Sequence, residues 1–106
     1  MARYLWKVSY TIDGVKGLVE EGGSARRATV QKLVTAMGGK LESFDFALGG
    51  YDAYLIAEMP ELTDVAAVSL AVAAAGGARL TSVQLLTPAE IDEAAKKNVP
   101  YRAPGA

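Results

Sequence analysis

Residues 40–59, KLESFDFALGGYDAYLIAEM, limit the possible folds more than any other part of the chain. Apolar and polar residues alternate through this segment, a Gly-Gly pair interrupts the alternation near its middle, and the alternation then resumes. Such a pattern is typical of two antiparallel strands joined by a tight turn. The segment therefore predicts a β-hairpin with Gly49-Gly50-Tyr51-Asp52 at its turn.

The chain before this hairpin predicts one strand and one helix. Residues 3–11 alternate and are rich in aromatic and β-branched side chains, which favours a strand. Glycines interrupt residues 12–23 repeatedly, so we expect no regular element there beyond a short helical turn at residues 15–21. Apolar residues at i, i+3, i+4 and i+7 then predict a helix over residues 25–37, with Ser24 as its N-cap.

The chain after the hairpin predicts a helix, a strand and a second, shorter helix. The first of these helices is expected to begin at Glu61 or Thr63 and to end near Ala75, just before a Gly-Gly pair. Residues 79–86 alternate as a strand does. Thr87-Pro88-Ala89-Glu90 matches a capping box with proline at the first helical position, which predicts a short helix over residues 88–97.

This order of elements, β-α-β-β-α-β with an added C-terminal helix, is that of the split βαβ or ferredoxin-like fold. We therefore predict an α+β protein with a four-stranded antiparallel sheet, two helices on one face and a short C-terminal helix. A chain of 106 residues suggests one domain. Residues 1–97 are expected to form this domain, and residues 98–106, which contain two prolines and a glycine, are expected to form an extended tail.

Composition excludes several classes of function. The 11 basic and 12 acidic side chains give a net charge of −1, and the basic residues are scattered, so we expect no binding to nucleic acid. Cysteine is absent, which excludes disulfides, thiolate catalysis and Cys-ligated metals. Histidine is absent too, which removes the usual general base and the commonest nitrogen ligand of metals. We expect neither a metal nor a cofactor.

No segment of the sequence is typical of membrane targeting. The N-terminus, MARYLWKVSYT, carries Lys7 within its apolar stretch and has no small-residue cleavage site, so it predicts a strand and not a signal peptide. The alanine-rich residues 65–75 are too few to cross a bilayer, which takes about 20 apolar residues. We therefore expect no contact with membranes and a cytoplasmic location.

Strict alternation along the strands divides their side chains between two faces of the sheet. The helix-covered face is predicted to carry Tyr4, Trp6, Val8, Phe44, Phe46, Leu48, Ala53, Leu55, Ala57, Val83 and Leu85. The second face is predicted to carry Lys7, Ser9, Thr11, Ser43, Asp45, Tyr54, Ile56, Glu58, Ser82 and Gln84.

The second face is expected to have a polar middle and apolar ends. Its apolar residues are Leu5, Leu41, Tyr54, Ile56, Leu80 and Leu86. This face either is open to water, as antiparallel sheets allow, or packs against the same face of another copy and closes a barrel with a polar lining. We favour the second interpretation because the apolar residues frame the polar ones. It predicts a homo-oligomer, a dimer or a higher assembly.

Four short motifs along the chain resemble those of one protein family. They are Tyr4…Tyr10-Thr11, Gly14-Val15-Lys16-Gly17, Gly38-Gly39-Lys40-Leu41, and Gly50-Tyr51-Asp52 followed by Glu58. With these motifs in this order over nearly its whole length, the chain resembles the GYD-domain family, small bacterial proteins grouped with the dimeric α/β-barrel proteins. The resemblance implies the fold and a dimeric barrel, and it carries over no activity. Fold relatives include cofactor-independent monooxygenases and small-molecule isomerases, which is an analogy of fold alone.

The first candidate site is Tyr51-Asp52 in the hairpin turn. The hydroxyl and the carboxylate would contact a ligand at the mouth of a pocket or act as acid and base. Alternatively, Asp52 accepts hydrogen bonds from backbone N–H groups of the turn, as Asp often does, while Tyr51 packs on the helices.

The second candidate site is a set of four polar residues on the second sheet face: Lys7, Asp45, Tyr54 and Glu58. A lysine between two acids inside a closed barrel would have a perturbed pKa and could transfer protons or hold a polar ligand. The alternative is a structural ion pair at a subunit interface.

The third candidate site is at the start of the helix over residues 25–37. Ser24, Arg26 and Arg27 could hold an anion with backbone N–H groups, since two arginines at a helix N-terminus oppose the helix dipole. Alternatively, the arginines pair with Glu20 and Glu21. Lys16 fits either version.

From these residues we expect a homo-oligomer that binds a small, possibly anionic molecule in a polar cavity between packed sheets. Two alternatives stay open. One is a cofactor-independent enzyme that acts by proton transfer with Lys7, Asp45, Tyr54 or Glu58. The other is a structural or partner-binding subunit whose residues 98–106 bind a neighbour.

Overall fold

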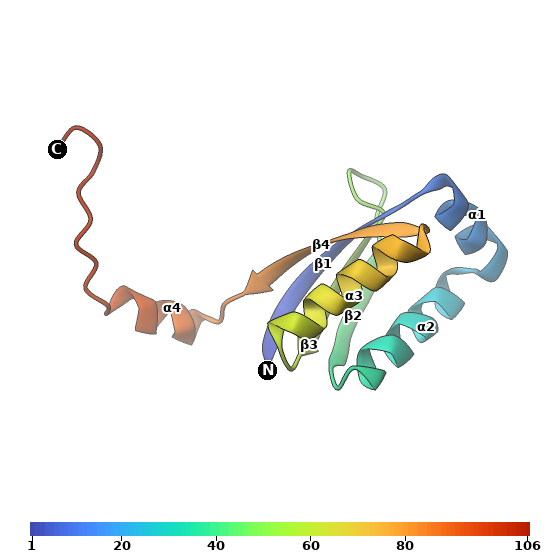
Figure 1. The fold of residues 1–106 in the computed structure, drawn as a ribbon, viewed down its shortest axis with the longest axis horizontal. Coiled ribbons are helices and arrows are strands. Elements are labelled where there is room, and N and C mark those ends of the chain that lie inside the picture. Colours follow the sequence, from blue (N-terminus) through green and yellow to red (C-terminus); the bar gives the residue numbers. More distant parts are fainter.

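The computed structural model describes residues 1–106 as four strands and four helices. Their bounds are β1 (Ala2–Tyr10), α1 (Ile12–Glu21), α2 (Gly23–Ala36), β2 (Lys40–Phe46), β3 (Ala53–Met59), α3 (Leu62–Ala75), β4 (Ala78–Leu85) and α4 (Pro88–Ala95). The strands form one antiparallel sheet in the order β2-β3-β1-β4, and α2 and α3 cover the same face of it (Figure 1). The predicted ferredoxin-like fold is confirmed.

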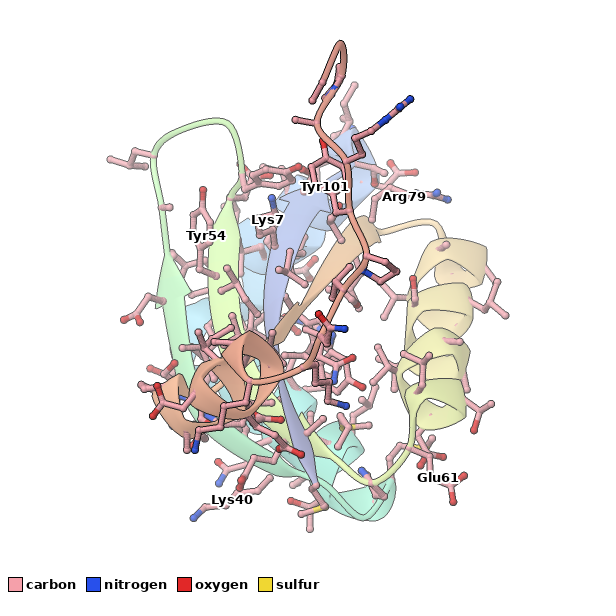
Figure 2. The ribbon with its side chains drawn as sticks, turned by 90° about the vertical axis from the view of Figure 1, so that its left-hand side faces the viewer. Lys7, Lys40, Tyr54, Glu61, Arg79 and Tyr101 are labelled. Atoms are coloured by element: carbon pink, nitrogen blue, oxygen red, sulfur yellow. The ribbon has the colours of Figure 1, made fainter.

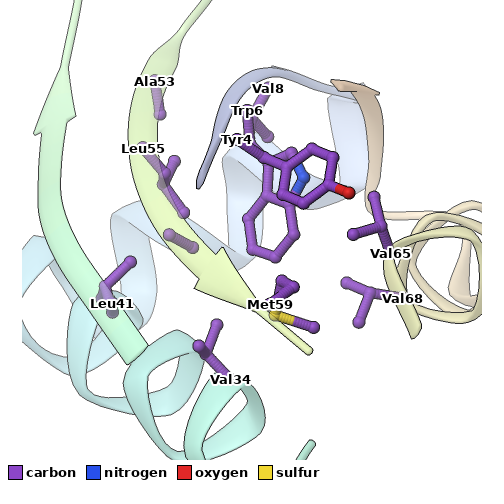
Figure 3. Packing of buried hydrophobic residues seen from close by; sticks show 11 residues of the cluster. Tyr4, Trp6, Val8, Val34, Leu41, Ala53, Leu55, Met59, Val65 and Val68 are labelled. Atoms are coloured by element: carbon purple, nitrogen blue, oxygen red, sulfur yellow. The ribbon is translucent and has the colours of Figure 1, made fainter. Parts of the chain in front are cut away.

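The core lies between this face of the sheet and the two helices (Figure 3). Its strand residues are Tyr4, Trp6, Val8, Leu41, Ala53, Leu55, Ala57 and Met59, and its helix residues are Val34, Val65 and Val68. The strand residues are mainly large and the α3 residues are medium-sized, so the helices pack close to the sheet. Burial of these apolar side chains is the main stabilising contribution to the fold.

The prediction that residues 12–23 are mostly irregular is wrong. Residues 12–21 form α1, which is capped by Thr11. The Thr11 hydroxyl accepts from the N–H of Gly14 at 3.2 Å and donates to the carbonyl of Gly76 at 2.8 Å. A Cβ on Gly14 would lie 1.8 Å from the carbonyl oxygen of Gly77. Gly14 therefore lets α1 contact the α3–β4 connection directly, and this packing outweighs the low helix propensity of glycine.

The predicted N-cap of α2 is also wrong. The helix begins two residues earlier than predicted, at Gly23, and its N-cap is Gly22, which has φ of 88° and no side chain to make a capping bond. The positive φ at Gly22 turns the chain sharply between α1 and α2. Ser24 therefore lies inside the first turn and is exposed.

The β2–β3 connection is longer than the predicted tight turn. Residues 47–52 lie between the two strands, and the loop is closed by a 2.8 Å hydrogen bond from the N–H of Ala47 to the carbonyl of Asp52. The hairpin itself is present as predicted. Leu48, which was assigned to the helix-covered face, lies in this loop and is fully exposed.

A register shift in β2 and an exchange of the two faces of β4 correct the assignment of the sheet faces. A register shift between Leu41 and Ser43 places Leu41 on the core face. In β4, Leu80 and Ser82 pair with Val8 and Trp6 and so lie on the core face. The residues that lie on the opposite side from the predicted one are Leu41, Leu80, Ser82, Gln84, Val83 and Leu85.

The chain after β4 extends away from the sheet (Figure 1). The predicted capping box is confirmed: the Thr87 hydroxyl accepts from the N–H of Glu90 at 3.1 Å, and the Glu90 carboxylate accepts from the N–H of Thr87 at 2.8 Å. The helix α4 ends at Ala95, somewhat before the predicted Lys97, and the residues that follow it form no further helix or strand. None of the helices is long and apolar enough to span a bilayer.

Candidate functional site

The face of the sheet that the helices leave uncovered has three rows of side chains running across the strands. We call it the open face. Since residues paired across antiparallel strands share a face, the strand register gives each row. The rows are Asp45–Tyr54–Lys7–Thr81, Ser43–Ile56–Leu5–Val83 and Lys40–Glu58–Arg3–Leu85.

The order of these rows reverses the predicted distribution of polarity. The middle row is mainly apolar, through Leu5, Ile56 and Val83, and polar or charged rows lie on both sides of it. The expected polar middle with apolar ends is therefore wrong. The reason is the register of β4, which brings Val83 beside Leu5.

Lys7, Tyr51 and Tyr54 lie together at the hairpin end of the open face. The Nζ of Lys7 is 4.8 Å from the centroid of the Tyr51 ring, a cation–π contact. The rings of Tyr51 and Tyr54 meet edge to face, with centroids 6.1 Å apart. Lys7 and Tyr54 are directly paired on β1 and β3 (Figure 2), and Asp45 pairs with Tyr54 from β2. We call Lys7, Tyr51 and Tyr54 the lysine–tyrosine cluster.

Glu58 does not belong to this cluster. It is four residues beyond Tyr54 on β3, which is about 13 Å at 3.3 Å per residue. Its neighbours across the strands are Arg3 and Lys40, and Figure 2 shows Lys40 at the opposite end of the sheet from Lys7. Arg3 also forms an ion pair with Glu42, Nε to Oε2 at 2.8 Å. The structure thus separates Glu58 from the three residues with which the sequence grouped it.

Asp52 holds the loop onto β1. Its Oδ2 accepts from the backbone N–H of Tyr10 at 2.8 Å, and its own N–H donates to the carbonyl of Val8 at 2.8 Å. Asp52 therefore accepts from a backbone N–H, as its alternative role supposed, but from that of Tyr10 on β1 and not from the turn. Tyr51 contacts Lys7 instead of the helices.

The arginines at the start of α2 have separate partners. Arg26 donates from Nε to the Glu21 carboxylate, and Arg27 donates from Nη1 to Oε1 of Gln31 at 3.2 Å. The hydrogen bond with Glu21 is the main reason that the pKa of Arg26 is raised above its ordinary value. Ser24 and Lys16 are exposed, and no hydrogen bond joins either of them to the arginines. Arg26 thus forms the ion pair with Glu21 that was the alternative to an anion site. Arg27 does not pair with an acidic residue.

Sequence reasoning missed a cleft on the helix-covered side of the sheet, between α2 and α3. Tyr10, Glu21 and Arg26 line it together with apolar residues. Small residues at helical spacing on both sides, Gly14 and Gly17 on α1 and Ala71 and Ala75 on α3, are the signal that could have indicated it.

The chemistry available at the open face is recognition of an anion or an aromatic molecule. An ammonium group and two phenol hydroxyls present donors, and two aromatic rings present faces and edges for stacking. No group of three or more acidic side chains is placed to hold a metal ion.

Comparison with known proteins identifies the family. The family model described as GYD domain matches residues 4–95, which is most of the chain. Searches of curated proteins and of solved structures found no match. The matched range includes β2, β3, β4, all of β1 except its first two residues, and the Gly50-Tyr51-Asp52 motif. As its sequence motifs indicated, the chain belongs to the GYD-domain family.

Proposed function

We propose that this GYD-domain protein is a homo-oligomer in which two copies pack their open faces together, and that it binds a small anionic molecule at the lysine–tyrosine cluster. The observation that carries the proposal is the middle row of the open face. Leu5, Ile56 and Val83 form an uncovered apolar row directly beside the cluster. A second copy on this row would remove apolar surface from water and enclose the cluster at the edge of the contact.

The total accessible surface of the chain supports the proposal that a second copy covers part of it. The accessible surface is 7273 Å², whereas a folded monomer of this mass is expected to expose about 5,700 Å². The excess, about 1,600 Å², is about twice the roughly 800 Å² that one partner contributes to an interface of standard size. The projecting C-terminal residues, where Ile91, Val99 and Tyr101 are exposed, contribute to it.

The cluster supports an anionic ligand because of how Lys7 is held. Its ammonium group lies against the Tyr51 ring, and no acidic side chain forms an ion pair with it. Burial of this surface by a second copy would lower the local dielectric and strengthen an interaction with an anion. The flanking phenol groups would add hydrogen bonds and ring contacts.

The test uses benzenesulfonate, an aromatic anion, in calorimetric titration of the full chain. Lys7→Gln is expected to weaken binding by roughly tenfold, the loss expected for one charge-assisted hydrogen bond. Lys16→Gln, which removes a lysine from the exposed surface of α1, is the matched control and is expected to bind as the unaltered chain does. Equal binding by both variants, or no binding by the unaltered chain, would contradict the proposed ligand site.

Val83→Glu tests the proposed interface separately. A carboxylate in the middle apolar row would be desolvated without a partner in the assembled protein, while it stays hydrated in the separate chain. Val83 is 39% exposed, so the fold itself should tolerate the change. We expect a lower mass in solution with an unchanged circular dichroism spectrum. An unchanged mass would contradict packing through this face.

A further inference from the structure

Residues 86–106, which include α4, project from the body of the protein, and we call them the C-terminal arm. Every residue of the arm is exposed. The hydrogen bonds made by residues 87–106 all join residues within that range. Neither burial nor hydrogen bonding therefore attaches the arm to the rest of its own chain.

The helix α4 is amphipathic, although all of its residues are exposed. Helical spacing places Ile91 and Ala95 on one face, and the acidic residues Glu90, Asp92 and Glu93 away from that face. Ile91 is 51% exposed. A helix of eight residues is marginal in water, because short helices gain most of their stability from packing of an apolar face. The apolar face of α4 therefore lacks a packing partner in the separate chain.

The residues after α4 add two large apolar side chains. Val99 and Tyr101 are exposed, and Pro100 lies between them. The ring of Pro100 fixes its φ, and the N–H of Tyr101 donates to the carbonyl of Val99 across it at 2.8 Å. Because this backbone is already restricted, docking of the two side chains costs less conformational entropy than docking of a flexible segment.

The arm leaves the sheet on the side of the open face. It begins directly after β4, whose last residue Leu85 belongs to the open face, and it projects away from the sheet (Figure 1). Seen from the side toward which the arm projects, Lys7 and Tyr54 of the open face are in view, and α1 and α2 lie behind the sheet (Figure 2). A second copy packed on the open face would therefore lie beside the arm.

The arm is longer than the distance between two packed sheets, which is about 10 Å. The eight residues of α4 span about 12 Å at 1.5 Å per residue. Residues 96–106 span up to about 35 Å when extended. The arm can therefore pass the sheet of a second copy and contact that copy along its side.

We propose that the C-terminal arm of each copy packs on the other copy, with the apolar face of α4 and the side chains of Val99 and Tyr101 turned toward it. The choice of partner rests on the proposed function, because packing of the open faces places a second copy where the arm projects. The excess of accessible surface, about 1,600 Å², is enough for two contacts of about 800 Å², one through the open face and one through the arm.

Ile91→Gln and Glu93→Gln test this proposal as a matched pair, because they place the same side chain on opposite faces of α4. Ile91→Gln should raise the dissociation constant of the assembly by roughly tenfold or more, as expected when the burial of an isoleucine side chain is lost. Glu93→Gln should leave the constant unchanged. Sedimentation equilibrium measures both, and equal dissociation constants in the two variants would overturn the proposal.

A spin label identifies the copy that the arm contacts. The chain has no cysteine, so Ala103→Cys gives a single attachment site near the end of the arm. The labelled chain is mixed with a nitrogen-15 chain that carries no label, and the copies are allowed to exchange. We expect the label to broaden amide resonances of the nitrogen-15 chain. Broadening that occurs only when the label and nitrogen-15 are in the same chain would overturn the proposal, since the arm would then fold back on its own chain.

Val83→Glu separates this proposal from the proposed function. If Val83→Glu lowers the mass in solution and Ile91→Gln has no effect on assembly, the arm proposal fails while the contact through the open face stands. If Ile91→Gln weakens assembly and Val83→Glu leaves the mass unchanged, the contact through the open face fails while that of the arm stands.

Discussion

At the scale of single residues, two glycines of α1 have opposite roles. Gly14 contacts the carbonyl of Gly77, where a Cβ would lie 1.8 Å from the oxygen, whereas Gly17 has free space around it. Gly14→Ala should therefore destabilise the protein by about 1–3 kcal/mol, as overpacking does. Gly17→Ala should stabilise it by about 0.5–1 kcal/mol, because alanine is the better helix former. Urea unfolding of both variants measures this difference, and similar effects in both would show that α1 does not pack as described.

Asp52 gives a second prediction at this scale. Its carboxylate accepts from the half-buried N–H of Tyr10 and so attaches the β2–β3 loop to β1. Asp52→Ala should cost about 1–3 kcal/mol, because it leaves that N–H without its acceptor. Asp52→Asn keeps an acceptor oxygen and should cost clearly less in the same unfolding measurement. If the two variants were equally destabilised, the hydrogen bond would not be the role of this side chain.

The pKa of Tyr10 predicts a dependence of stability on pH. Burial raises this pKa, so the folded chain keeps the phenol proton at a pH where the unfolded chain releases it. The contribution to stability is complete below about pH 10, the ordinary pKa of tyrosine, and is lost as the pH rises through the folded value. Tyr10→Phe should therefore lose less stability than the unaltered chain as the pH rises above about 10. Parallel pH profiles of the two proteins would contradict this.

At the scale of helices and strands, the sequence was sufficient to predict the fold. It was not sufficient to predict which side chains lie on which face of the sheet. The hairpin, the two covering helices and the capping box have local signals that tertiary contacts reinforce. In β4, however, the apolar residues Leu80, Val83 and Leu85 do not share one parity, so alternation cannot decide which face they occupy. The pairing with β1 decides it, and this pairing is not a local property.

The same limit applies to the candidate sites. Lys7, Asp45 and Tyr54 could be grouped from strand parity, and the structure places them in one row. Their separation from Glu58 follows from distance along a strand, which parity does not show. The cleft was missed because α1 was not predicted, so the helical spacing of Gly14 and Gly17 could not be recognised, and α1 depends on the contact of Gly14 with a distant loop.

The helix α4 should unfold locally, independently of the rest of the protein. Its residues are exposed, and its fold is supported mainly by the capping box at Thr87 and Glu90. In the separate chain, Thr87→Ala should weaken α4 locally by about 0.5–2 kcal/mol and leave the global unfolding midpoint unchanged. Amide hydrogen exchange along residues 88–95 measures the local effect. A lower global midpoint would show that α4 packs on the body of the protein.

At the scale of the whole molecule, the chain is more extended than its length requires. Its radius of gyration is 17.0 Å and its longest extent is 56 Å, whereas a compact domain of this length has a radius of about 13 Å. The projecting α4 and the residues after it account for this shape (Figure 1). An arm with exposed apolar side chains and an uncovered sheet face are both expected of a subunit that binds another copy.

Sedimentation equilibrium of the full chain over a wide range of concentration tests this account most directly. The account predicts a particle of at least twice the chain mass of 11.1 kDa, and a return toward that mass in Val83→Glu. A single species of 11.1 kDa at every concentration would contradict the claim that a second copy covers the open face.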